Sequence, residues 1–120
     1  MPSFQPESVK ELIEDELNWE SPLYQLIARL FVDNTAGTYE WDIIGATVCF
    51  WHMYAHKTKP NIKKAGVFPA ALEYFVGQAY GFEFVTRSYL SEKYDISEGT
   101  ITQRTRQLIE FAEESTGRAR

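Results

Sequence analysis

Near the carboxyl end of the chain, several polar side chains match the chemistry of DNA base edges. Thr102, Gln103 and Arg106 lie in a segment whose apolar residues recur at helical intervals. Gln and Arg can each make paired hydrogen bonds with one base in the major groove, and Thr adds a hydroxyl. We expect these three side chains to approach bases, and Glu98 to accept a hydrogen bond from cytosine.

A basic stretch precedes this segment. No acidic residue lies between Asp42 and Glu73, although the whole chain carries a net charge of −5. Basic side chains neutralise phosphates and fix the position of a protein on the duplex. An ordinary solvated lysine loop is the alternative. The residues that we expect to contact phosphates are Lys57, Lys59, Lys63, Lys64, Arg87 and Arg104.

The elements that must position these side chains follow the pattern of a helix-turn-helix. Thr86 is a good cap for a helix that ends near Tyr94, and Ser97 is a good cap for the next helix. Asp95 stands between them and tolerates the backbone of a sharp turn. The turn would let the second helix project its first two turns into the major groove. The residues expected to be buried are Leu90, Ile96, Ile101 and Leu108.

The stretch from Lys57 to Phe111 resembles the latter part of a cyclin-type repeat, as in transcription factor IIB. The resemblance consists of a lysine-rich loop, paired alanines with a tyrosine, a Thr-capped helix, and Thr-Ile near the start of the next helix. It implies a five-helix, DNA-associated frame, to which the second and third helices of this chain would contribute. The matching residues are 57–64, Ala70, Ala71, Tyr74, Thr86, Leu90, Thr100 and Ile101.

The chain departs from that family in two respects. Asp95 stands at the turn, where the family favours glycine. Glu92, Asp95 and Glu98 would repel phosphate, and residues 85–108 carry four basic and three acidic side chains. A degenerate helix-turn-helix that contacts proteins is therefore the alternative interpretation.

Elsewhere the patterning also predicts helices. We expect one from Ser8, whose spacing to Glu11 matches a capping box, and one from Ser21 and Pro22 to Gly37 with an apolar stripe of Leu23, Leu26, Ile27, Leu30 and Phe31. A third helix should run over residues 39–56. A fourth should start near Phe68 and carry Glu73 on its outer side. Residues 82–85 should form an extended connection that places its aromatics in the core. The predicted fold is all-α, a compact bundle of about six helices. Residues 1–120 are expected to form one domain. It has an amino-terminal addition over 1–20, a core over 21–112 and the helix-turn-helix over 85–112.

Composition excludes several function classes. The 120 residues include 15% aromatics, which is enough for a real core. Cys49, His52 and His56 share a helical face, but one straight helix supplies three tetrahedral ligands poorly, so we expect ordinary packing and neither a metal nor a cofactor. The chain has no Gly-rich phosphate loop, serine elbow or HExxH motif, so we expect no enzymatic activity. Without a signal-like or membrane-spanning segment, we expect a cytoplasmic protein with no membrane partner.

The sequence thus favours a DNA-binding domain that regulates transcription or assists a regulator. Double-stranded DNA is the expected partner. In the alternative interpretation, the partner is another protein or a second copy of the chain.

Overall fold

The computed structural model describes residues 3–115. Within this range it has six α-helices, one π-helical turn and no strand, which confirms the all-α prediction. The chain divides into two compact units, Met1–Ile62 and Lys63–Arg120, and each is described by itself. The finer division into an addition over 1–20 and a core over 21–112 stays a prediction.

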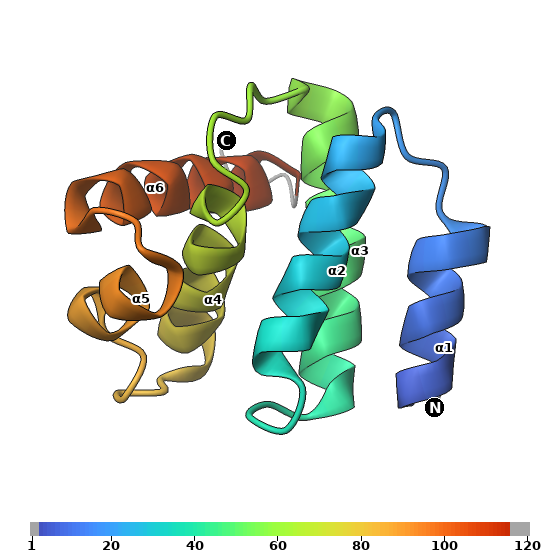
Figure 1. Ribbon diagram of the computed structural model, residues 1–120, viewed down its shortest axis with the longest axis horizontal. Coiled ribbons are helices and arrows are strands. Elements are labelled where there is room, and N and C mark those ends of the chain that lie inside the picture. Colours follow the sequence, from blue (N-terminus) through green and yellow to red (C-terminus); the bar gives the residue numbers. More distant parts are fainter. Residues whose placement is uncertain (1–2, 116–120) are drawn as a thin grey trace. The chain divides into compact units, whose positions relative to one another are not determined.

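The amino-terminal unit is built from three α-helices that lie side by side in Figure 1. They are α1 (Pro6–Glu11), which continues into the π-helical turn η1 (Leu12–Glu16), α2 (Pro22–Thr35) and α3 (Trp41–Thr58).

The predicted starts of two helices have different outcomes. The Ser21 side chain accepts a hydrogen bond from the Leu23 amide at 3.1 Å, so the predicted cap of α2 is confirmed. The predicted cap at Ser8 is wrong, because α1 begins at Pro6 after Gln5. Ser8 instead lies inside the first turn, and its hydroxyl accepts from the Gln5 amide at 2.8 Å.

The predicted apolar stripe of α2 is only partly buried. Ile27 and Phe31 are buried, but Leu23 and Leu26 are 36% and 39% exposed. Behind the buried side lies Trp51 of α3, whose indole donates to the Tyr24 carbonyl at 2.9 Å. The face of α2 toward α3 is thus narrower than the sequence pattern indicates.

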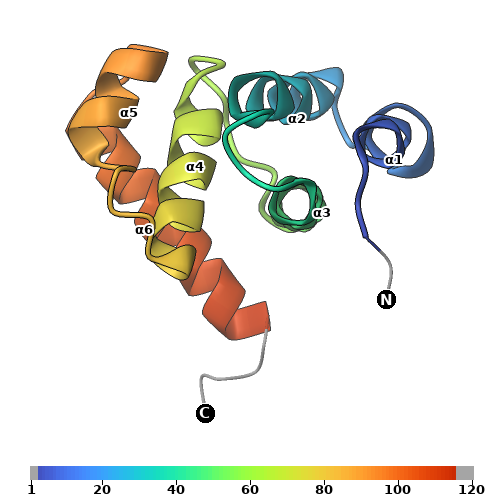
Figure 2. The ribbon, with the colours of Figure 1, turned by 90° about the horizontal axis from the view of Figure 1, so that it is seen from below.

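The carboxy-terminal unit consists of α4 (Val67–Tyr80), α5 (Arg87–Tyr94) and α6 (Glu98–Ser115). Figure 2 shows α6 running across α4, and these two helices share the main contact of the unit. Ala70 and Ala71 are fully buried, and the Thr105 hydroxyl lies 3.4 Å from the Ala71 carbonyl. Small side chains on α4 therefore allow a close approach to α6.

Candidate nucleic-acid interface

Local capping signals form the turn between α5 and α6. Thr86 accepts a hydrogen bond from the Tyr89 amide at 3.1 Å, and Ser97 accepts from the Thr100 amide at 3.2 Å. Between the helices, Asp95 adopts the left-handed conformation with φ of 57° and ψ of 49°. The predicted helix, turn and helix are thus observed at the predicted residues.

The apolar contacts of this unit set which face of α6 is exposed. Leu90, Ile101 and Leu108 are completely buried, and Ile96 is 5% exposed. Because adjacent helical residues point about a hundred degrees apart, burial of Ile101 turns its neighbours outward. Glu98, Gln103 and Arg106 on the first turns of α6 are exposed, as predicted, and so is Gly99. Thr102, which we also expected to face outward, is half-buried.

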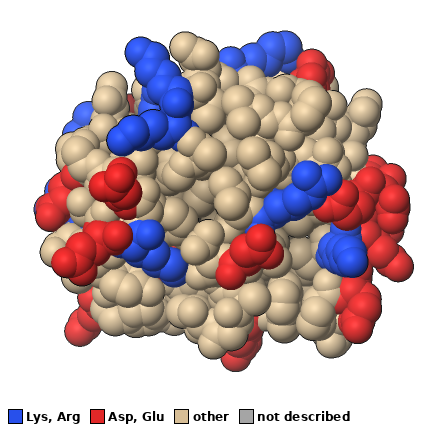
Figure 3. All heavy atoms as spheres, viewed as in Figure 1, with Lys and Arg blue, Asp and Glu red and all other residues tan. Residues whose placement is uncertain are grey.

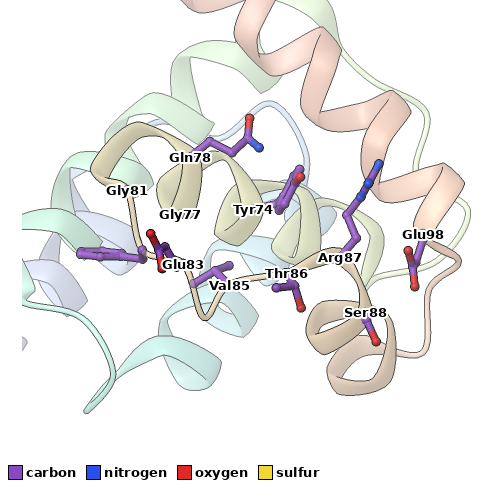
Figure 4. A pocket seen from close by; sticks show the side chains of 11 residues that line it. Tyr74, Gly77, Gln78, Gly81, Glu83, Val85, Thr86, Arg87, Ser88 and Glu98 are labelled. Carbon is purple, nitrogen blue, oxygen red and sulfur yellow. The ribbon is translucent and has the colours of Figure 1, made fainter.

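Arg87 and Thr102 come together from two helices. The Arg87 guanidinium donates to the Thr102 hydroxyl at 3.0 Å, and Thr102 is half-buried. Figure 4 shows Arg87 extending from the start of α5 toward α6, with Glu98 at the beginning of α6. Arg87, the predicted phosphate ligand, and Thr102, the predicted base contact, therefore lie together on one edge of the unit, which we call the Arg87 edge.

Arg104 has a different environment from the other predicted phosphate ligands. Its guanidinium lies 5.3 Å from the centre of the Phe68 ring and donates to the Gln107 side chain at 3.0 Å. The residue is half-buried and on the same helix as the exposed Arg106. The Arg104 guanidinium therefore makes its contacts within the carboxy-terminal unit.

The four predicted lysines are exposed and are divided between the units. Lys57 lies in the last turn of α3, so the predicted loop from residue 57 is wrong at its start. Lys59 caps α3 in the left-handed conformation, and its ammonium donates to the His56 carbonyl at 2.8 Å and lies 3.8 Å from Glu20. Lys63 and Lys64 precede α4 and belong to the carboxy-terminal unit.

A hollow of about 640 Å³ lies beside the Arg87 edge. The last turns of α4, the connection to α5, the start of α5 and Glu98 line this hollow (Figure 4). Figure 3 shows basic and acidic side chains interleaved on the face that it draws, where α5 and α6 lie. The local field is therefore mixed in sign, and Glu98 opposes a phosphate placed at Arg87.

Glu73 was expected on the outer side of α4, and that prediction is wrong. The side chain is fully buried, and its carboxylate accepts hydrogen bonds from the Lys93 ammonium at 3.0 and 3.1 Å and from the Tyr94 hydroxyl at 2.8 Å. Both partners lie on α5, so this ion pair fastens the first helix of the helix-turn-helix to α4. Nothing near Glu73 in the sequence indicates such a partner twenty residues away.

The placement of the aromatics in residues 82–85 is also wrong. Phe84 is 53% exposed and Phe82 is half-buried. Val85, which follows them before α5, is buried. The predicted extended conformation is wrong as well, because Glu83 and Phe84 form a turn in which the Val85 amide donates to the Phe82 carbonyl at 3.1 Å.

The histidines of α3 contact the segment before α2. His52 Nε2 lies 2.8 Å from the Asn18 carbonyl, and His56 Nδ1 lies 3.0 Å from the Glu20 carboxylate. Burial raises the pKa of the Cys49 thiol. Over residues 3–115, no group of three or more His, Cys, Asp or Glu side chains is arranged to hold a metal ion.

No α-helix in the described part of the chain is both long enough and apolar enough to cross a membrane.

Comparisons with known proteins identify one distant relative. It is a protein of Bacillus subtilis (strain 168) named "Uncharacterized protein YccF", which is 28% identical over 94 residues. The alignment covers 77% of this chain and 26% of the relative, so the chain spans about a quarter of that protein's length. No family model matches the chain, and no solved structure matches it.

Proposed function

We propose that the carboxy-terminal unit binds double-stranded DNA through the first turns of α6, as a transcription-regulator-like or accessory domain. The observation that carries the proposal is the helix, left-handed turn and helix that bury Ile101 and leave Gln103 and Arg106 exposed. Gln and Arg on the first turns of such a helix are the side chains that read base edges in the major groove. The resemblance to the cyclin-type repeat of transcription factor IIB supports the same proposal.

Positioning on the duplex would come from cations around that helix. Arg87 and Arg106 lie on the same unit as Lys63 and Lys64, and all four are exposed. Each phosphate neutralised contributes a slope of about −0.9 to the dependence of log affinity on log salt. Four contacts therefore predict a slope of about −3.6 on duplex DNA.

Fluorescence anisotropy on labelled duplex DNA over a range of salt concentrations tests the proposal. Lys63→Ala with Lys64→Ala should weaken all sequences alike and reduce the slope by up to about two units. Gln103→Ala should cost about 1–3 kcal/mol on a sequence selected for binding, and little on random DNA. Glu110→Ala is the matched control, because Glu110 is exposed on the same face two turns further along α6.

Two results would reject DNA binding. One is the absence of any binding at low salt, and the other is an affinity that does not depend on salt. Either result would favour the alternative, in which the helix-turn-helix contacts a protein partner or a second copy of the chain. The acidic side chains Glu92, Asp95 and Glu98 within the motif favour that alternative.

A further inference from the structure

Four aromatic side chains form a row on the carboxy-terminal unit, which we call the aromatic row: Tyr80, Phe82, Phe84 and Tyr89. Successive ring centres are 5.7, 6.2 and 6.0 Å apart, and the first two pairs are stacked. Tyr80, Phe84 and Tyr89 are 54%, 53% and 37% exposed. Three large aromatics exposed side by side make a contiguous apolar surface, and such surfaces mark interaction sites.

The backbone holds this row outward. Gly81 ends α4 in the left-handed conformation, and the Phe82 amide donates to the Gly77 carbonyl at 2.8 Å. The Val85 side chain packs directly on Gly77, where even a Cβ atom would lie 2.7 Å from it. Glu83 and Phe84 are the central residues of a turn that the Val85 amide closes on the Phe82 carbonyl at 3.1 Å, and both side chains are exposed.

Tyr89, the member of the row on α5, lies on a different side of that helix from Arg87. Tyr89 follows Arg87 by two residues, which places the two side chains about 200° apart around the helix. Arg87 contacts Thr102 on α6, whereas Lys93, whose ammonium is 5.4 Å from the centre of the Tyr89 ring, contacts Glu73 on α4. Tyr89 therefore faces away from Arg87, whereas Phe82 and Glu83 line the same hollow as Arg87, so the row and the Arg87 edge adjoin there.

Charge around the row indicates the kind of molecule that fits. Glu83 lies between the two phenylalanines in sequence, and Glu92 lies one turn after Tyr89 on α5; both are exposed. The ammonium of Lys93 is paired with the buried Glu73 carboxylate. Arg87 lines the hollow with Phe82 and Glu83 but is turned toward α6, where it donates to Thr102, so the charges beside the exposed rings are mainly acidic. Acidic surroundings repel phosphate and disfavour a two-fold contact between copies, which would bring the same glutamates together.

We propose that the aromatic row binds an amphipathic helical segment of a partner protein that carries apolar side chains on one face and lysine or arginine beside them. The rings supply the apolar anchors, since aromatic residues dominate binding energy at interfaces. Glu83 and Glu92 supply the charge complementarity. This interaction does not depend on DNA binding.

The probe is a synthetic helical peptide with leucine on one face and lysine on the other, compared with the same peptide carrying glutamate in place of lysine. Isothermal titration should show the lysine peptide binding at least about tenfold more tightly than the glutamate peptide. Phe84→Ser should weaken the lysine peptide by about tenfold or more. Leu26→Ser, at a similarly exposed apolar residue of α2, should leave the affinity unchanged.

Charge reversal separates this interaction from general attraction to an acidic protein. Glu83→Lys with Glu92→Lys should shift the preference toward the glutamate peptide. Glu110→Lys with Glu114→Lys changes the net charge equally at exposed residues of α6 and should not. All of these positions are exposed, and circular dichroism melts verify that the variants fold.

Three results would overturn the proposal. The first is an equal effect of the two charge reversals. The second is salt-resistant binding of single-stranded oligothymidine that Phe84→Ser abolishes, which would identify the row as a base-stacking surface. The third is self-association in sedimentation that Phe84→Ser abolishes, which would identify a second copy as the occupant.

Discussion

Lys93→Met tests whether the buried ion pair between α4 and α5 stabilises the helix-turn-helix. The substitution keeps an unbranched side chain but removes the ammonium that donates to both Glu73 oxygens at 3.0 and 3.1 Å. Glu73 is completely buried, so its carboxylate would lose a charged partner without gaining water. The Tyr94 hydroxyl would still donate to it, as it does now at 2.8 Å.

The magnitude follows from burial. Breaking a buried ion pair by removing one member costs about 3–5 kcal/mol, because the remaining charge is left uncompensated. The Lys93 side chain is 19% exposed, so the ion pair is not completely removed from water and the loss is smaller. Together with the retained Tyr94 hydrogen bond, this places the expected cost near the lower end, at about 3 kcal/mol.

A second variant distinguishes a lost charge partner from lost packing. Glu73→Gln combined with Lys93→Met leaves no buried charge and keeps an acceptor for Tyr94. It should be more stable than Lys93→Met alone by about 1 kcal/mol or more. Lys10→Met is the matched control, because Lys10 is exposed on α1 and should change stability by less than about 0.5 kcal/mol.

Urea denaturation followed by circular dichroism measures these differences at neutral pH. If Lys93→Met costs less than about 1 kcal/mol, the carboxylate does not depend on this ammonium. If the double variant is no more stable than the single one, the cost arises from packing rather than from unpaired charge. Either result would refute the reasoning.

Three further predictions concern packing and ionisation. Ile101→Ala should lower the free energy of unfolding by about 2–5 kcal/mol, because Ile101 is completely buried. Thr102→Ala loses one exposed hydrogen bond from Arg87 and should lower it by at most about 1 kcal/mol. Thermal melts that show the reverse order would mean that the faces of α6 are misassigned. Because burial raises the pKa of the Cys49 thiol, iodoacetamide should alkylate the native protein more slowly than the urea-unfolded protein at about pH 8, and equal rates would contradict this. The hydrogen bond from Arg29 lowers the pKa of Glu14 from 4.5, so its stabilisation is present above that value and is lost as the pH falls through the folded pKa. The difference in urea midpoint between the native protein and Arg29→Gln should therefore shrink on acidification, and a constant difference would exclude this cause.

Local signals of the sequence predicted the helix-turn-helix well. Thr86, Asp95 and Ser97 act through hydrogen bonds and dihedral angles within a few residues, so their roles can be inferred without knowing what packs nearby. The burial of Ile101 follows from the same register once the turn is placed. These are the residues on which the candidate DNA-binding edge depends.

Features set by distant partners could not be predicted in this way. Glu73 is buried because Lys93 and Tyr94 reach it from the next helix, and the sequence around Glu73 carries no sign of that contact. Phe84 was assigned to the core as part of an extended connection, yet it lies in the turn between Phe82 and Val85, and Val85 packs on Gly77 instead. In both cases, whether the side chain is buried or exposed depends on which of several neighbouring side chains fills the space in the core.

The contact between Gly77 and Val85 also constrains how this protein can change during evolution. A Cβ atom at position 77 would lie 2.7 Å from the Val85 Cβ atom, so the two positions cannot both carry a Cβ atom without moving the connection between α4 and α5. Among descendants that keep this connection unchanged, alanine at 77 must be accompanied by glycine at 85, because every other residue keeps the Cβ atom that alanine would meet. The two positions are therefore inherited as a pair, and covariation between them would identify relatives that retain the same loop even where the rest of the sequence has diverged.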